Sequence, residues 1–300
     1  MISKQVEAVL QALLVTLLWS TSWVLIKIGL DEIPALTFAG LRYSMAFLCL
    51  LPLALLRHNR RYLKSMSGNQ WLQLALLGIL YYAIVQGLIF LALAYLPAAS
   101  TSLVWSLTSL FVALAGTIWL GEKLSWIGWF GVGLSVAGPL VFFSQAARIP
   151  AGGLGLVIAI FGMLANVGAA ILGRYVNRQE NLPPVMITTI SMGVGAFVLL
   201  LAGTGIEGMP ALNWSHLAII AWLAVVNTAF AFTLWNHTLR TLNAAQSSVI
   251  NNTMVIQVAL LAWLFLGESL DGWEWLGIIL AGAGAVLVQL RRKSLGVVNG

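Results

Sequence analysis

The chain has 300 residues, of which 60% are hydrophobic and 8% are charged, and its formal net charge at pH 7 is +6. Soluble domains carry about a quarter charged residues, so this composition excludes a soluble enzyme or a secreted domain. It also excludes a disordered chain, which requires low hydrophobicity. The single cysteine, Cys49, and the scattered histidines give no disulfide framework and no metal-ligand spacing, so we expect neither a metal nor a cofactor.

Ten apolar segments follow one another along the chain, each long enough to cross a bilayer as a helix of about 20 residues. We expect them at 8–29, 35–56, 71–96, 98–120, 125–145, 153–174, 183–203, 214–239, 243–266 and 273–290. Glycine, proline and charged residues occupy the breaks between them, for example at 57–64, and indicate loops. The predicted fold class is therefore an all-α integral membrane protein with ten transmembrane helices.

Basic residues concentrate on one side of this predicted topology. If the N-terminus is cytoplasmic, twelve of the fifteen Lys and Arg residues face the cytoplasm, while Arg148 faces outward and Lys27 and Arg42 lie within helices. The positive-inside rule then predicts a multi-pass protein of the inner or plasma membrane with both termini in the cytoplasm. The basic charge follows from topology and suits contact with the lipid bilayer, so we expect no nucleic acid partner.

The two halves of the chain share a sequence motif in register. Leu-Gly-Glu-x-Leu occurs at 120–124 and again at 266–270, and a tryptophan follows each motif at the same distance. Two repeats, 1–148 and 149–300, would hold five helices each, and an odd number of helices inverts the second repeat in the membrane. We therefore predict an inverted repeat of five plus five helices that forms one structural unit with a central cavity, as in many secondary transporters.

These motifs are similar to those of the EamA-type family of the drug/metabolite transporter superfamily. The matching residues are Leu-Leu-Trp-Ser-Thr-Ser-Trp at 17–23, Gly-Leu-Arg-Tyr at 40–43 and the paired Leu-Gly-Glu-x-Leu motifs. The resemblance covers nearly the whole chain and implies a cavity lined mainly by helices 1, 3, 4, 6, 8 and 9. It also implies outward transport of small metabolites, including amino acids, or of drugs. The chain departs from the family where a proline often precedes the motif glycine, because Ser109 and Val255 stand there.

Aromatic, hydroxyl and amide side chains recur on helix faces that would meet at the centre of the bundle. Amides inside a bilayer are costly unless they find partners, so they face either a neighbouring helix or a wet cavity. For the whole set we favour a substrate cavity. Its predicted lining is Trp19, Ser22, Trp23, Tyr82, Gln86, Thr101, Trp105, Asn166, Asn227, Trp235, Ser247, Asn251 and Asn252.

Arg42 lies several residues inside the second predicted helix, where a charge is costly. One interpretation is a charge site that attracts an anionic group of the substrate. The other is a structural residue whose side chain extends outward to Asp31 or Glu32. The sequence leaves both interpretations open.

The paired motifs end the fourth and ninth predicted helices. Gly121 and Gly267 are expected in the left-handed conformation that glycine adopts just past a helix end. The dipole of its own helix disfavours a carboxylate at this place, so we expect Glu122 and Glu268 to bind a neighbouring donor, such as a helix N-terminus. We favour this structural role over a gate.

The function predicted from these features is a secondary transporter or exporter of small organic metabolites or drugs, amino-acid-like or amphipathic, that works by alternating access. One alternative is a membrane-embedded enzyme, but the helices contain no paired aspartates, zinc ligands or nucleophile–base set. Another is a non-transporting scaffold.

Small residues on the fifth and tenth helices predict close helix packing, within the bundle or at a homodimer contact. They are Gly131, Ser135, Gly277, Ala281 and Ala285.

Overall fold

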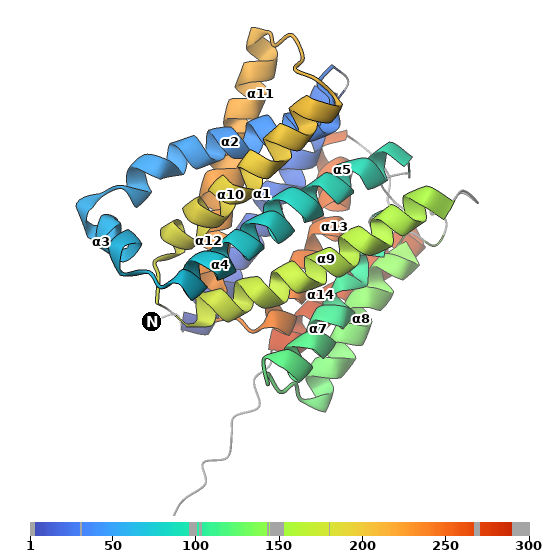
Figure 1. The fold of residues 1–300 in the computed structure, drawn as a ribbon. Helices are drawn as coiled ribbons and strands as arrows, with labels where there is room; N and C mark the ends of the chain where they lie inside the picture. The colour runs from blue at the N-terminus through green and yellow to red at the C-terminus, as the bar shows by residue number, and fades with distance from the viewer. Residues whose placement is uncertain are drawn as a thin grey trace, which may run out of the picture.

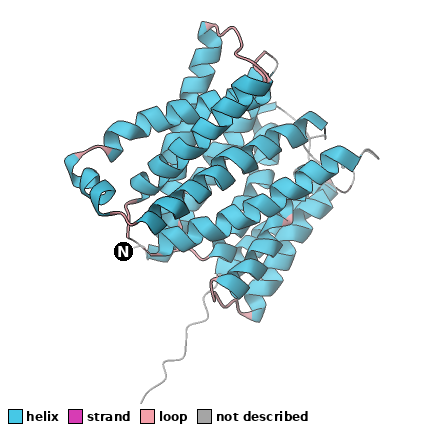
Figure 2. Cartoon of the chain, viewed as in Figure 1, coloured by secondary structure: helices cyan, strands magenta, loops and turns pink. Residues whose placement is uncertain are grey.

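The structure, a computed structural model, describes residues 4–30, 32–95, 101, 104–142, 144, 153–179, 181–266 and 271–289. Within these ranges the regular secondary structure is entirely helical (Figure 2), which confirms the all-α prediction for them. The long helices lie side by side in one bundle (Figure 1).

Helices occupy the predicted apolar segments. Their bounds are α1 (Lys4–Leu30), α2 (Ala35–Ala54), α3 (Arg57–Ser65), α4 (Gly68–Leu77), η1 (Gly78–Val85), α5 (Gln86–Tyr95), α7 (Thr108–Trp119), α8 (Trp126–Phe142), α9 (Gly153–Arg178), α10 (Pro184–Ile206), α11 (Trp214–Ala224), η2 (Val225–Phe230), α12 (Ala231–Thr238), α13 (Ala244–Leu266) and α14 (Gly272–Gln289). Five described stretches are long and apolar enough to cross a membrane: Ala35–Ala54, Gly68–Ala92, Gly153–Arg178, Pro184–Ile206 and Trp214–Thr238. The shorter apolar helices are Val104–Trp119, Trp126–Phe142 and Gly272–Val288. Ten membrane crossings therefore stay a prediction.

A short helix, α3, occupies the stretch 57–64 that the sequence predicted as a loop. Its basic side chains are exposed, while Tyr62 and Leu63 pack against a buried cluster. The Nδ2 of Asn59 donates a hydrogen bond of 2.8 Å to the carbonyl oxygen of Leu53 and so ties α3 to the end of α2. The dense charge indicated a loop, yet in the structure it forms the polar face of an amphipathic helix.

The backbones of α8 and α14 pack almost in contact. A Cβ atom on Gly138 would lie 2.6 Å from the Cβ of Ala281 and 2.7 Å from the carbonyl oxygen of Gly277. A Cβ on Gly284 would lie 2.5 Å from the backbone nitrogen of Ser135. Larger residues would push the helices apart, so the small-residue stripes predicted on these helices pack against each other within the chain.

Two long helices each contain a π-helical segment. η1 lies between α4 and α5, and η2 lies between α11 and α12. The shift that aligns Gly121 with Gly267 moves η1 onto residues 224–231, a range that includes η2. π-helices are rare and occur frequently at functional sites. Their equivalent positions in the two halves therefore mark this level of the bundle as a candidate for a functional site.

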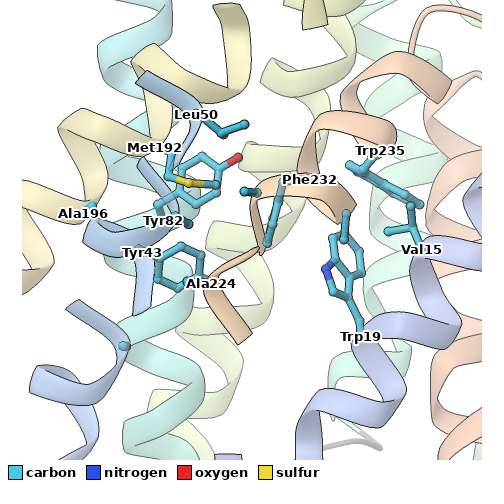
Figure 3. Packing of buried hydrophobic residues seen from close by; sticks show 14 of the residues in the cluster. Val15, Trp19, Tyr43, Leu50, Tyr82, Met192, Ala196, Ala224, Phe232 and Trp235 are labelled. Carbon is cyan, nitrogen blue, oxygen red and sulfur yellow. The ribbon is translucent and has the colours of Figure 1, made fainter. Parts of the chain in front are cut away.

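Aromatic side chains from α1, α2, η1 and α12 meet beside these π-helical segments (Figure 3). The ring of Phe232 lies between Trp19, at 4.9 Å between centroids, and Tyr82, at 5.1 Å. Tyr43 joins the group, with its centroid 5.6 Å from that of Tyr82. This aromatic cluster links the two halves of the chain at the centre of the bundle.

Candidate functional site

A cavity of about 140 Å³ lies next to the aromatic cluster. Residues from α1, α2, η1, α5, α9, α12 and α13 line it, together with two residues that precede α7. They are Trp19, Ser22, Ile26, Arg42, Tyr43, Tyr81, Val85, Gln86, Ile89, Phe90, Thr101, Trp105, Asn166, Phe232, Asn251 and Met254. We call this the main cavity. Its lining is mostly apolar, with a few polar side chains, as in many small-molecule sites.

A second cavity of about 30 Å³ lies nearer the end of the bundle where α1 begins. Gln5 of α1 donates a hydrogen bond of 3.3 Å to Gln246, so the starts of α1 and α13 share this end. Three side chains, Tyr81, Asn166 and Asn251, line both cavities. These three residues therefore separate the main cavity from the second one.

Three amides of the main cavity have no partner among the described residues. Gln86, Asn166 and Asn251 make no side-chain hydrogen bond to any other described residue, and the Oδ1 of Asn251 is buried. An amide left unpaired in an apolar interior is costly, so these groups require water or a ligand in the cavity. Their predicted role at a wet site fits this environment.

Arg42 is only 4% exposed and lines the main cavity. Its Nε donates a hydrogen bond of 2.7 Å to Thr228 Oγ1, and its Nη2 lies 3.5 Å from the carbonyl oxygen of Asn227. The predicted alternative was an outward contact of Arg42 with Asp31 or Glu32. Arg42 makes no such contact with Glu32, whose carboxylate pairs with His216 at 2.9 Å. Asp31, the other acid considered, lies outside the described residues.

The π-helical segment η2 supplies both partners of Arg42. A π-helix replaces i→i+4 hydrogen bonds with i→i+5 bonds, which leaves a carbonyl group at its edge for another donor. The carbonyl oxygen of Asn227 accepts such a bond from the indole Nε1 of Trp19 at 3.1 Å, besides its contact with Arg42. η2 thus positions one aromatic and one cationic side chain of the main cavity.

The structure brings most of the predicted cavity residues together. The main cavity takes Trp19, Ser22, Gln86, Thr101, Trp105, Asn166, Asn251 and the charge-site candidate Arg42. The second cavity takes Tyr82, Trp235 and Ser247. The side chain of Trp23 lies outside the described part of the chain.

Two predicted lining residues, Asn227 and Asn252, line neither of these two cavities. Asn227 directs its Nδ2 to the carbonyl oxygen of Leu18, and Asn252 donates a hydrogen bond of 2.7 Å to the carbonyl oxygen of Ser135. Both amides therefore join helices, which was the alternative for any single amide. No sequence pattern indicated some of the lining residues, among them Tyr81, whose place depends on the π-helical register of η1.

At one end of the bundle, Glu122 links two other helices. Gly121 has the predicted left-handed conformation, with φ of 65°. Glu122 binds Arg174 through its Oε1 at 2.8 Å and accepts the backbone N–H of Ala244 through its Oε2 at 2.7 Å. The predicted contact of this carboxylate with a helix N-terminus is thus confirmed. Gly267 and Glu268 lie outside the described residues.

Comparisons with known proteins agree with this architecture. A model described as the EamA-like transporter family matches residues 6–144 and again residues 153–290. YoaV of Bacillus subtilis, named an uncharacterized transporter, is 25% identical over 92% of this chain and 94% of its own length. An Escherichia coli protein named a probable amino-acid metabolite efflux pump is 25% identical over 90% of each chain. A solved crystal structure matches with a TM-score of 0.79 at 18% identity, over 94% of this chain and 96% of that one, and this likeness concerns the fold alone.

Proposed function

Because this chain belongs to the EamA-like transporter family, we propose that it is a secondary transporter that exports small organic metabolites or drugs by alternating access. The observation that carries the proposal is the main cavity, which holds amides without a partner among the described residues, beside aromatic side chains at the centre of the bundle. A non-transporting scaffold would have no need for polar groups that lack internal partners. An enzyme would need a nucleophile, a base or a metal in place of neutral amides.

Alternating access requires a path that closes on one side at a time. Two adjacent cavities, which share the lining residues Tyr81, Asn166 and Asn251, suit such a path. The contact of Glu122 with Arg174 and Ala244 closes the end where α1 begins, which the positive-inside rule assigns to the cytoplasm. We propose that repeats 1–148 and 149–300 are inverted in the membrane and rock against each other around the main cavity.

The size and lining of the main cavity favour an amino-acid-like or small amphipathic substrate. A volume near 140 Å³ is comparable with an engineered cavity that holds a benzene-sized molecule. The aromatic cluster suits an apolar part, and the amides suit polar groups. Binding of a phosphorylated compound requires several Arg or Lys donors, whereas the main cavity has one cationic side chain within the described residues. The name of the Escherichia coli relative, an amino-acid metabolite efflux pump, agrees with this class.

Counterflow of labelled amino acids into liposomes that contain the purified protein tests the proposal. A matched pair of variants makes the test specific to the cavity: Ile89 lines it, whereas Ile84, also on this membrane-crossing stretch, is 42% exposed. We expect transport by the wild-type protein and by Ile84→Trp, and loss of transport in Ile89→Trp because the larger ring fills the cavity. Equal transport in both variants would place the substrate path elsewhere. No counterflow of any amino acid or amphipathic drug would reject the proposed function.

A further inference from the structure

We infer that Arg42 is the substrate-recognition residue of the main cavity and that it binds a carboxylate of the transported molecule. This inference deepens the proposed function and rests on it. It assigns the substrate class as organic monoanions or zwitterions with a carboxylate, and it excludes neutral analogues as good substrates.

The first argument is an unbalanced buried charge. An arginine side chain stays protonated in proteins, and a buried cation is costly unless an anion or several hydrogen-bond acceptors compensate it. Arg42 is 4% exposed, and no carboxylate of the described residues pairs with it. It is also the one charged residue that lines the main cavity within the described part of the chain. A ligand carboxylate would supply the missing countercharge.

The second argument is a count of donors. A guanidinium group has five N–H donors in a fixed fork. The described residues supply two acceptors for Arg42, Thr228 Oγ1 at 2.7 Å from Nε and the carbonyl oxygen of Asn227 at 3.5 Å from Nη2. The remaining N–H groups have no described acceptor, although Arg42 borders open space. A carboxylate accepts two parallel N–H bonds from such a fork, which a neutral carbonyl group cannot match.

The third argument is that the fork is held in place before the ligand arrives. Thr228 and Asn227 belong to η2, and the guanidinium carbon lies 5.4 Å from the ring centroid of Tyr43. The partners occupy Nε and one N–H of Nη2, and they leave Nη1 and the other N–H of Nη2 without a described acceptor. A group held in this way loses little conformational freedom when it binds its ligand. A residue with only a structural role would be expected to use its donors on the protein.

The experiment compares each protein amino acid with its carboxamide as a ligand pair. Binding is measured as the rise in melting temperature of the purified protein, and transport as counterflow into liposomes. For at least one pair we expect the wild-type protein to prefer the carboxylate by roughly tenfold or more, as charge-assisted hydrogen bonds give. In Arg42→Gln this preference should disappear, and Arg42→Lys should retain only part of it. Arg60→Gln removes a cation from the exposed face of α3 and should leave the preference unchanged.

The preference ratio separates recognition from a structural role, because structural damage lowers binding of both members of a pair together. If Arg42→Gln does not fold, the wild-type protein still provides a test. Phenylglyoxal should modify Arg42, as read by mass spectrometry of its peptide, and the preferred amino acid should protect it whereas the carboxamide should not. Transport of acids and carboxamides at equal rates would overturn the inference and leave the proposed function standing. Absence of both binding and transport for the whole panel would reject both.

Discussion

The carboxylate of Glu122 binds the first turn of a helix that begins 122 residues further along the chain, because its Oε2 accepts the backbone N–H of Ala244 at 2.7 Å. A carboxylate at the C-terminal end of its own helix is disfavoured by the helix dipole, and the same charge is favoured at the N-terminus of another helix. The contact thus turns an unfavourable position just after the end of α7 into a favourable one for α13. It also joins the two halves of the chain at one end of the cavities.

Replacement of Glu122 should lower stability and transport together. Glu122→Ala leaves the backbone N–H of Ala244 and the Nε–H of Arg174 without their acceptor, at a cost of roughly 1.5–3 kcal/mol in the free energy of unfolding. Thermal unfolding in detergent measures this loss. Glu7→Ala is the matched control, because Glu7 is exposed and accepts one hydrogen bond from Gln11. Transport that vanishes while stability stays unchanged would show that Glu122 acts as a gate.

The close packing of α8 and α14 predicts a sharp difference between two glycines of one helix. A Cβ on Gly138 would meet the Cβ of Ala281 at 2.6 Å, whereas a Cβ on Gly133 would meet nothing within 4 Å. Gly138→Ala should destabilise the protein by roughly 1–3 kcal/mol, as overpacking does. Gly133→Ala should be neutral or stabilising, because alanine favours a helix more than glycine does. Equal melting temperatures for the two variants would contradict this packing.

Adjacent asparagines of α13 should behave differently. Asn251 lines both cavities with a buried, unpaired Oδ1, whereas Asn252 donates its hydrogen bond to Ser135. We expect Asn251→Ala to weaken the apparent affinity for a transported amino acid by roughly tenfold, the value of one hydrogen bond of about 1.4 kcal/mol, with little loss of stability. Asn252→Ala should lower the melting temperature and leave the affinity nearly unchanged. Concentration-dependent counterflow together with thermal unfolding distinguishes the two results.

Loss of an aromatic face from the main cavity should weaken binding of apolar substrates. Trp105 lines the cavity, and its ring lies over Gly162, where a Cβ would approach it to 2.4 Å. Trp105→Ala should raise the apparent Km for amino acids with large apolar side chains by roughly tenfold, because an aromatic contact contributes about 0.5–1.5 kcal/mol. Small polar amino acids should be affected less. An equal change for every amino acid would indicate a general disturbance of the bundle.

Side-specific labelling tests the orientation of the chain. In a Cys49→Ala background, single cysteines at Arg60 and at Met209 should react from opposite sides of the membrane, and the one at Arg60 only from the cytoplasm. Met209, which is 63% exposed, is a better position than Glu207, whose carboxylate accepts the backbone N–H of Thr37 at 3.0 Å. Labelling of both cysteines by an impermeant reagent from outside would refute the predicted topology.

The sequence predicted helices well because a membrane helix is specified by length and apolarity alone. It predicted the left-handed conformation of Gly121 and the partner type of Glu122, because glycine and carboxylates have strong preferences at helix termini. It did not distinguish Asn227 from Asn251, because the amide group is the same and only the rotation of each helix decides whether it meets a backbone carbonyl or a cavity. For Asn227 that rotation depends on the π-helical segment η2, for which no residue type is diagnostic.

A break in the fourth predicted helix is another feature that residue type alone did not indicate. The family often has a proline in this helix, whereas this chain has Ser109, yet the helix is interrupted at Leu107 just before α7 begins. The buried hydroxyl of Ser109 donates a hydrogen bond of 3.0 Å to the carbonyl oxygen of Ser106. Serine hydroxyls that bond back to their own helix often bend it, so a hydroxyl stands where a ring would otherwise bend the helix.

The matched positions of η1 and η2 also bear on the history of the chain. A π-bulge adds one residue to a turn of α-helix without lengthening the helix. Two independent insertions at equivalent places are less economical than a single insertion inherited by both halves. If both halves descend from one five-helix unit, the extra residue was already present in that unit. A present-day relative with only five helices, assembled as an antiparallel pair, should carry the same π-helical turn in its third helix, and a crystal structure of such a relative would test this order of events.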